Sequence, residues 1–409
     1  MSENTGFAQS VGKGFFPLDK ELGLLPGGLT PIGYEQLVRL AGWMPFKRAA
    51  ELFTDFTGIT VSEAMSRRYT EAAGEAYVEL QEEAVEQLER EKPSAPQGVQ
   101  KAQVSVDGAM VPLVKGEWAE VKTLVIGEVQ PAVKEKEEWV VHTQALSYFS
   151  RLASAEEFGR LALVEMHWRG VENAKQVAAI QDGADWEQGF VDYHCPRAVR
   201  ILDFAHAAEH LNQVGQALYG ENTPQAQQWL GERLHKLKTE GPEPILAELE
   251  QLTQQHPQTP EIVTHLTYLK KRQTQLQYPQ FRDQGWPIGS GIIESGNKLV
   301  VEARLKGSGM HWARGHVNPM LALRNILCSD RWKHAWPTIA VRLQPPQPPG
   351  TLHPVEAPAA PSDRPAPPLP RQFQPPQNLA PDQKKTKENP WRRFKVGRSL
   401  YHPENYPKK

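Results

Sequence analysis

Residues 285–312 read GWPIGSGIIESGNKLVVEARLKGSGMHW, a pattern that predicts a glycine-rich loop followed by a helix. Ser290 is placed to cap that helix, and Leu299 and Val300 belong to its apolar face. Glu294 then falls in the first turns, where the helix dipole alone would favour a carboxylate. The residues after it include several that are positive or protonatable, which suits a site that handles phosphate groups: Lys298, Arg304, Lys306 and His311.

Two further acids follow short β-like runs earlier in the chain. In residues 101–116, KAQVSVDGAMVPLVKG, valines alternate with polar residues, which predicts a strand ending at Asp107. In residues 175–186, KQVAAIQDGADW, an apolar run over 176–181 is followed by Asp182. Two aspartates at strand ends and a glutamate on a later helix supply the hard oxygen ligands of a two-metal phosphoryl-transfer site, with Mg²⁺ ions about 3.5–4 Å apart.

Composition limits the class of protein. The 409 residues are enough for two or three domains, and 46 Lys+Arg against 48 Asp+Glu give a formal charge of −2. Nucleic-acid binding would therefore depend on local basic patches. Cys195 and Cys328 are the only cysteines, which excludes a disulfide framework and a cysteine-rich zinc site within this sequence. No run approaches the roughly 20 apolar residues of a membrane span, so we expect a soluble, cytoplasmic protein.

Four sequence blocks resemble those of DDE transposases of bacterial insertion sequences, in the ISKra group related to Mutator-like elements. They are VDGA (106–109), QDGADW (181–186), ILDFAH (201–206) and PIGSGIIESGNK (287–298), the last followed by RLKGSGMHW (304–312). The resemblance covers most of residues 16–335. It implies an RNase H-like catalytic core in which Asp107, Asp182 and Glu294 hold two Mg²⁺ ions, with Mn²⁺ as a substitute.

The same resemblance implies an activity. The protein would bind the terminal repeats of its element, hydrolyse each 3′ end, and join the freed 3′-OH to target DNA as a homo-oligomer at the nucleoid. Asp107 would bridge both metal ions, and Asp182 and Glu294 would each complete one site. Two alternatives are another RNase H-like nuclease and an inactive, transposase-derived DNA-binding protein. Inverted repeats on either side of the gene would count against the first alternative.

The second metal ligand has three candidates: Asp182, Asp185 and Asp203. In an RNase H-like sheet the strand after the first helix lies beside the first strand, and sequence order gives that place to 176–181. We therefore expect Asp182 to be the ligand. Asp203 and His206 resemble a C/D-x-x-H element of Mutator-like transposases and are expected to contact DNA, although both could instead cap the following helix.

The chain as a whole predicts an α/β protein with a mixed sheet, helices on its faces, an all-helical insertion and an N-terminal helical domain. Strand-like runs lie near 102–107, 109–115, 121–129 and 138–146, and a helix is expected from Asn318-Pro319 through Trp336. The expected organisation is an extension (1–29), a helix-turn-helix-like region (30–92), a linker (93–99), a first core part (100–206), a helical insertion (207–284), a second core part (285–336), a Pro-rich linker (344–383) and a basic tail (384–409).

Several segments are candidates for DNA contact. A helix over about 45–57, Gly58 and a helix capped by Ser62 follow the helix-turn-helix plan, which would present Ser66, Arg67 and Arg68 to a groove. A helical hairpin with solvated arginines is the alternative. In the insertion, Trp229 and the basic run 270–272 are further candidates, and the basic tail with its aromatic residues suits non-specific DNA contact.

Overall fold

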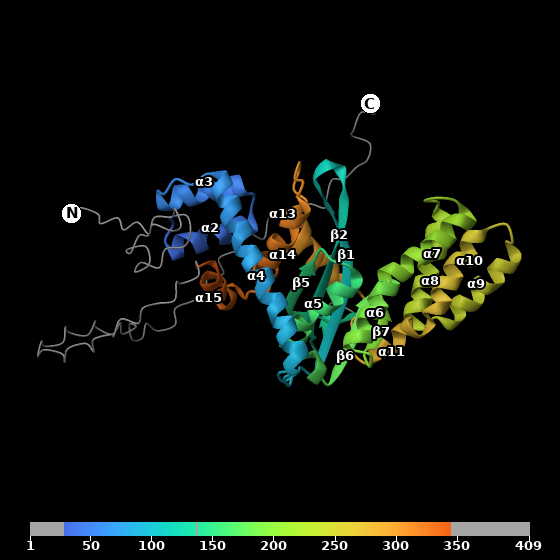
Figure 1. Cartoon of the computed structure of the whole chain (residues 1–409). Helices are drawn as coiled ribbons and strands as arrows, with labels where there is room; N and C mark the ends of the chain where they lie inside the picture. Colours follow the sequence, from blue (N-terminus) through green and yellow to red (C-terminus); the bar gives the residue numbers. More distant parts are fainter. Residues whose placement is uncertain (1–27, 136–137, 345–409) are drawn as a thin grey trace, which may run out of the picture. The chain divides into compact units, whose positions relative to one another are not determined.

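The computed structural model describes residues 28–135 and 138–344 (Figure 1). The Pro-rich linker, the basic tail and most of the N-terminal extension that the sequence predicts lie outside these residues. None of the helices within the described ranges combines the length and the apolar character that crossing a membrane requires.

A five-stranded mixed sheet organises the structure, in the order β5-β2-β1-β6-β7 (Figure 1). β1 pairs antiparallel with β2, β2 pairs antiparallel with β5, and β6 and β7 run parallel to β1. The predicted α/β class with a mixed sheet is therefore confirmed. The strands are β1 (Lys101–Pro112), β2 (Trp118–Val129), β5 (Thr143–Arg151), β6 (Gln176–Gln181) and β7 (Val199–Leu202), beside a small hairpin of β3 (Val133–Glu135) and β4 (Glu138–Val140).

Two strand predictions were wrong in detail. The run 102–107 and the first part of 109–115 form one strand, β1, because Gly108 stays in the ladder opposite Lys122. Asp107 therefore lies inside this strand, which ends at Pro112, and the expectation that a strand ends at Asp107 was wrong. A Cβ on Gly108 would lie 2.3 Å from Glu120 Oε1, so glycine leaves space for that side chain instead of making a turn. The run 138–146 divides between β4 and β5, and β5 continues to Arg151.

The N-terminal helices begin and end where capping residues predict. Thr30 Oγ1 accepts a hydrogen bond from Gly33 N–H (3.1 Å) and Ser62 Oγ accepts one from Met65 N–H (3.1 Å), while Gly58 ends its helix with a φ of 71°. The helices are α2 (Pro31–Trp43), α3 (Phe46–Thr57) and α4 (Glu63–Glu91). α4 connects two parts of the molecule, because its first half packs with α2 and α15 and its second half packs on α5.

Helices cover both faces of the sheet. Val104 and Val106 pack on one face with α5 (Ala155–Trp168) and α6 (Asp185–His194). Ala109 and Val111 pack on the other face, against the segment that contains the glycine-rich motif. That segment forms α12 (Gly291–Gly296), the π-helix η4 (Asn297–Glu302), α13 (Ala303–Leu305) and α14 (Arg314–Cys328). The period of two along β1 therefore places Asp107 on the α12 face.

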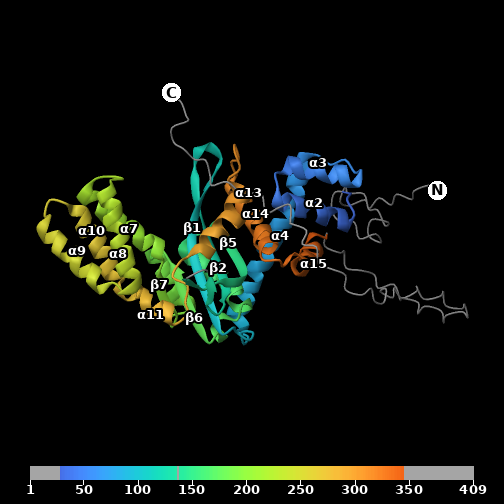
Figure 2. The same ribbon diagram turned by 180° about the vertical axis from the view of Figure 1, so that it is seen from behind.

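The expected helical insertion follows β7 and lies on that side of the sheet (Figures 1 and 2). Its helices are α7 (Phe204–Tyr219), α8 (Pro224–Thr239), α9 (Glu243–Gln255), α10 (Pro260–Lys271) and α11 (Tyr278–Asp283). They share an apolar core with Ile180 of β6 and Ile201 of β7, so the insertion is packed directly onto the parallel strands.

α14 closes the outer edge of β5. Asn325 Oδ1 accepts from Ser150 N–H (3.0 Å) and its Nδ2 donates to Ser150 O (3.2 Å). Asn318 makes the same pair of bonds to Leu152, at 2.8 and 3.1 Å. These bonds satisfy an edge strand that would otherwise offer free backbone groups for aggregation.

The sequence predicted that a helix begins at Asn318, and this prediction was wrong. α14 begins at Arg314, with Pro319 inside it, and the predicted single helix divides before α15 (Trp332–Leu343). The asparagine side chain bonds to a distant strand instead of capping its own helix.

Asn325→Ala should lower the free energy of unfolding by about 2–4 kcal/mol, because it leaves the buried N–H and C=O of Ser150 without partners. Urea denaturation measures the change, with the exposed Gln227→Ala on α8 as the control. An Asn325→Ala protein as stable as the control would show that water satisfies this edge equally well.

Candidate active site

Three aspartates lie at one level across the parallel strands. The register pairs Val104 with Ala179, and continuing it by three residues brings Asp107 level with Asp182. The β6–β7 register places Asp203 level with Asp182 in the same way. The predictions that strand 176–181 lies directly beside the strand of Asp107, and that the next strand lies one place further out, are therefore confirmed.

Asp107 is held by two hydrogen bonds. Its Oδ1 accepts from Gly108 N–H (2.6 Å) and its Oδ2 accepts from Asn297 Nδ2 (2.8 Å). Burial raises the pKa of Asp107, the two hydrogen bonds act against that rise, and the nearby Glu120 adds to it. Asn297 sits in the π-helix that follows α12, and its buried Oδ1 has no hydrogen-bond partner in the described structure. Sequence analysis did not single out Asn297, because its contact with Asp107 joins residues 190 positions apart.

The ionised form of Asp182 is likewise disfavoured by burial and by neighbouring negative charges. Burial raises its pKa to about 6, His206 opposes the rise, and the charges of Asp107 and Asp203 add to it. Its backbone is fixed by α10, because the Tyr268 hydroxyl donates to Asp182 O at 2.5 Å. Asp107 and Asp182 are thus two neighbouring carboxylates that repel each other in partly buried surroundings.

Glu187 is a third acid near this pair, and the sequence analysis missed it. Its Oε2 accepts from the N–H groups of Gly183 (2.8 Å) and Ala184 (3.0 Å), and the residue is only 2% exposed. Burial raises its pKa to about 8, and the charge of Asp182 adds to the rise. The available signal was a glutamate at the third position of α6, where such a side chain commonly caps the helix start.

Because β7 ends at Leu202, Asp203 is the N-cap of α7 and His206 lies in the first turn of that helix. Asp203 Oδ1 accepts from Ala205 N–H (3.3 Å) and from Ser290 N–H (3.1 Å). Asp203 therefore caps α7 and also ties down the loop before α12. His206 forms an ion pair with Glu209 (3.4 Å) and is one of the charges that act on Asp182.

Glu294 does not join the aspartates in this structure. Its side chain is 68% exposed and forms an ion pair with Lys298. It lies one helical turn before Asn297, on a helix that packs against β1 and β2. The approach is close at Gly296, where a Cβ would lie 2.7 Å from Val125 Cγ2. Within residues 28–135 and 138–344, no group of three or more His, Cys, Asp or Glu side chains is arranged to hold a metal ion.

The other predicted DNA contacts are scattered. Arg67 and Arg68 are exposed on the first turns of α4, but Ser66 is buried there, so the expectation that it faces a groove was wrong. His311 is exposed beside Trp312. Lys306 pairs with Glu302 at 2.7 Å, as Lys298 pairs with Glu294.

Three candidates are corrected, because their side chains are buried. Arg304 is 2% exposed, donates to Ala41 O (2.9 Å) and lies over the Phe46 ring. Trp229 is 5% exposed within the insertion core. Arg272 is 7% exposed and donates through Nε to Gly183 O (3.1 Å). These side chains hold the protein together and offer no surface to DNA.

No protein-family model matches this chain, and no curated protein matches its sequence. Function therefore has to be argued from the residues and their arrangement.

Asp182 and Glu187 should make stability fall as pH rises. Their folded pKa values, about 6 and about 8, lie above the ordinary 3.8 and 4.5, so between those values the folded state binds more protons than the unfolded state. Their contribution to the free energy of unfolding is complete below about pH 4 and is lost as pH rises through 6 and 8. The free energy of unfolding then falls by at most about 1.4 kcal/mol per pH unit for each proton.

Glu187→Gln tests this, because it keeps an oxygen for the two backbone N–H groups and cannot ionise. We expect the variant to gain stability over wild type from pH 5 to pH 9 in urea titrations. The exposed Glu86→Gln should retain the wild-type pH dependence. A Glu187→Gln protein with an unchanged pH dependence would mean that Glu187 is already ionised in the folded state.

Proposed function

We propose that the chain is a DDE transposase: a DNA enzyme that uses Mg²⁺ to cleave the 3′ ends of an insertion sequence and join them to target DNA. The observation that carries this proposal is the placement of Asp107 and Asp182, level on adjacent parallel strands, where burial raises the pKa of both and the charge of Asp107 adds to the rise at Asp182. Such groups cluster at functional sites more often than elsewhere.

The strand order supports an RNase H-like core. Three antiparallel strands are followed by two that run parallel to the first, in the order β5-β2-β1-β6-β7, and the first and fourth strands carry the two aspartates. The insertion enters between the last strand and the Glu294 helix, as the resemblance to transposases implies.

The residues present fit a hard divalent cation. Asp107 and Asp182 supply carboxylate oxygens, and the unpartnered Oδ1 of Asn297 is a further oxygen donor beside Asp107. Glu294 would join them by leaving Lys298, an exposed partner whose ion pair contributes little to stability. A bound cation would supply charge neutralisation and activation of a water or a 3′-OH.

The protein's own groups would position the reacting strand. Asn297 and Gly108 fix the orientation of the Asp107 carboxylate, and α10 fixes the turn that carries Asp182. His206 lies close enough to act electrostatically on both Asp107 and Asp182, and it would contact the backbone of a bound strand. The exposed Arg67 and Arg68 would contribute to recognition of the element ends, with the protein acting as a homo-oligomer on DNA in the cytoplasm.

Mg²⁺ should raise the melting temperature at pH 8, where Asp182 with a pKa of about 6 is ionised, and much less at pH 5, where Asp182 is protonated. At a Mg²⁺ concentration a hundred times the dissociation constant, the free energy of unfolding should rise by about 2.7 kcal/mol. Asp107→Asn and Asp182→Asn should abolish the effect, while Asp185→Asn, exposed and paired with Lys271, should keep it. Equal Mg²⁺ stabilisation in all four proteins would place the cation elsewhere.

Cleavage tests the function itself. With DNA fragments from either side of the gene as substrate, Asp107→Asn and Glu294→Gln should lower Mg²⁺-dependent cleavage by on the order of 100-fold or more, while gel-shift affinity changes little. Asp185→Asn again serves as the control. Cleavage without joining in wild type would favour another RNase H-like nuclease, and DNA binding without cleavage would favour an inactive descendant.

Cysteine variants identify the second ligand. Thiolate favours Mn²⁺ over Mg²⁺, so Asp182→Cys should recover part of its cleavage activity in Mn²⁺. Asp203→Cys should show no such rescue, because Asp203 serves as a helix cap and loop tether. Rescue at Asp203 alone would reverse the assignment.

A further inference from the structure

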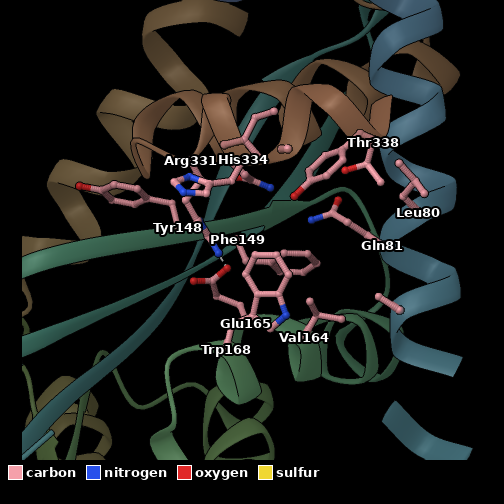
Figure 3. Close-up of a pocket in the computed structure, with 15 residues that line it drawn as sticks. Leu80, Gln81, Tyr148, Phe149, Val164, Glu165, Trp168, Arg331, His334 and Thr338 are labelled. Atoms are coloured by element: carbon pink, nitrogen blue, oxygen red, sulfur yellow. Dashed lines mark hydrogen bonds and ion pairs between the residues drawn. The ribbon is translucent and has the colours of Figure 1, made fainter. Parts of the chain in front are cut away.

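A cavity of about 190 Å³ lies between α4, α5, α15 and the edge strand β5 (Figure 3). None of Asp107, Asp182 and Glu294 lines it, so its role is independent of the proposed nuclease site. Its size exceeds the ~150 Å³ of a protein cavity that holds a benzene ring. The space is therefore sufficient for one small ring compound.

Most of the cavity wall is apolar. Phe149 from β5, Val164 from α5 and Ile326 from α14 line it, together with the Tyr77 ring from α4 (Figure 3). Trp168 is another lining residue and is 54% exposed, so this side of the cavity adjoins solvent. A ligand could therefore enter without unfolding the protein.

Several polar side chains interrupt this apolar wall, among them Gln81, His334 and an ion pair between Arg331 and Glu165. Arg331 Nη2 donates to Glu165 Oε2 at 2.5 Å, and the Glu165 side chain is only 5% exposed. Figure 3 shows this pair at the cavity. The second carboxylate oxygen, Glu165 Oε1, has no hydrogen-bond partner in the described structure, and neither has Arg331 Nε. A buried acceptor and a donor of the same ion pair are thus both left unused, which is rare in folded proteins.

We propose that this cavity binds a small, uncharged aromatic compound that carries a hydrogen-bond donor and an acceptor side by side, as an aromatic carboxamide does. The amide N–H would donate to Glu165 Oε1, the amide oxygen would accept from Arg331 Nε, and the ring would lie against Phe149 and Val164. A neutral ligand is preferred because Glu165 and Arg331 already neutralise each other. An aromatic carboxylate would meet the Glu165 charge, and a plain hydrocarbon would leave both polar groups unpaired.

Calorimetric titration and thermal shift on the full-length protein test the proposal with three probes of similar size: benzamide, benzoate and toluene. Benzamide should bind and raise the melting temperature, and benzoate and toluene should bind at least about tenfold more weakly. Failure of benzamide to bind at millimolar concentration, or equal binding of toluene, would overturn the proposal and leave the cavity as a water-filled space.

Two variants locate the binding. Glu165→Gln should weaken benzamide binding by about tenfold or more, because an amide N–H₂ would replace the free acceptor. The exposed Glu75→Gln, on α4, should bind as wild type does.

Ala335→Leu, from the α15 wall, should abolish binding by filling the cavity and remains informative if Glu165→Gln fails to fold. Circular dichroism confirms folding of each variant. Full benzamide affinity in Ala335→Leu would show that the compound binds elsewhere.

Discussion

The repulsion between the Asp107 and Asp182 carboxylates is the constraint around which this structure is arranged. The parallel ladder between β1 and β6 fixes their positions, and burial makes the ionised forms of both costly. Among the residues that the structure describes, the hydrogen-bond partners of the Asp107 carboxylate are a backbone N–H and an amide, neither of which carries a charge that would offset the repulsion. The proposed Mg²⁺ ion would supply the positive charge that offsets this repulsion.

The stability that tolerates this arrangement comes from elsewhere in the molecule. Long-range polar contacts lock the elements around the sheet: the asparagines of α14 bond to β5, and the buried Arg304 and Arg324 donate to backbone carbonyls of α2. Apolar clusters cover both faces of the sheet and continue into the insertion. The acids can therefore remain poorly solvated while the surrounding frame stays rigid, as preorganised sites require.

The sequence predicted what local patterns determine. Alternation located β1, the order of the elements placed β6 beside it, and Thr30, Ser62 and Gly58 marked helix ends through local hydrogen bonds or backbone conformation. It could not predict contacts between residues far apart in the chain. Arg304 and Ala41 are 263 positions apart, so their contact leaves no local pattern, and the arginine resembled a surface residue until the fold placed it inside. Burial of Glu187 was hidden in the same way.

The position of Glu294 follows from two constraints of different strength. The helix crosses the sheet so closely at Gly296 that a Cβ there would lie 2.7 Å from Val125 Cγ2, so glycine is the residue that permits this approach. The side chain, in contrast, is held only by an exposed ion pair to Lys298, four residues along the same helix. The Glu294 carboxylate lies one turn from Asn297, the residue that contacts Asp107. Because it is weakly held, it can change partners without any rearrangement of the fold. If the proposed function holds, local rotation of the Glu294 side chain, and not a movement of domains, would be the simplest way to bring it to Asp107 and Asp182.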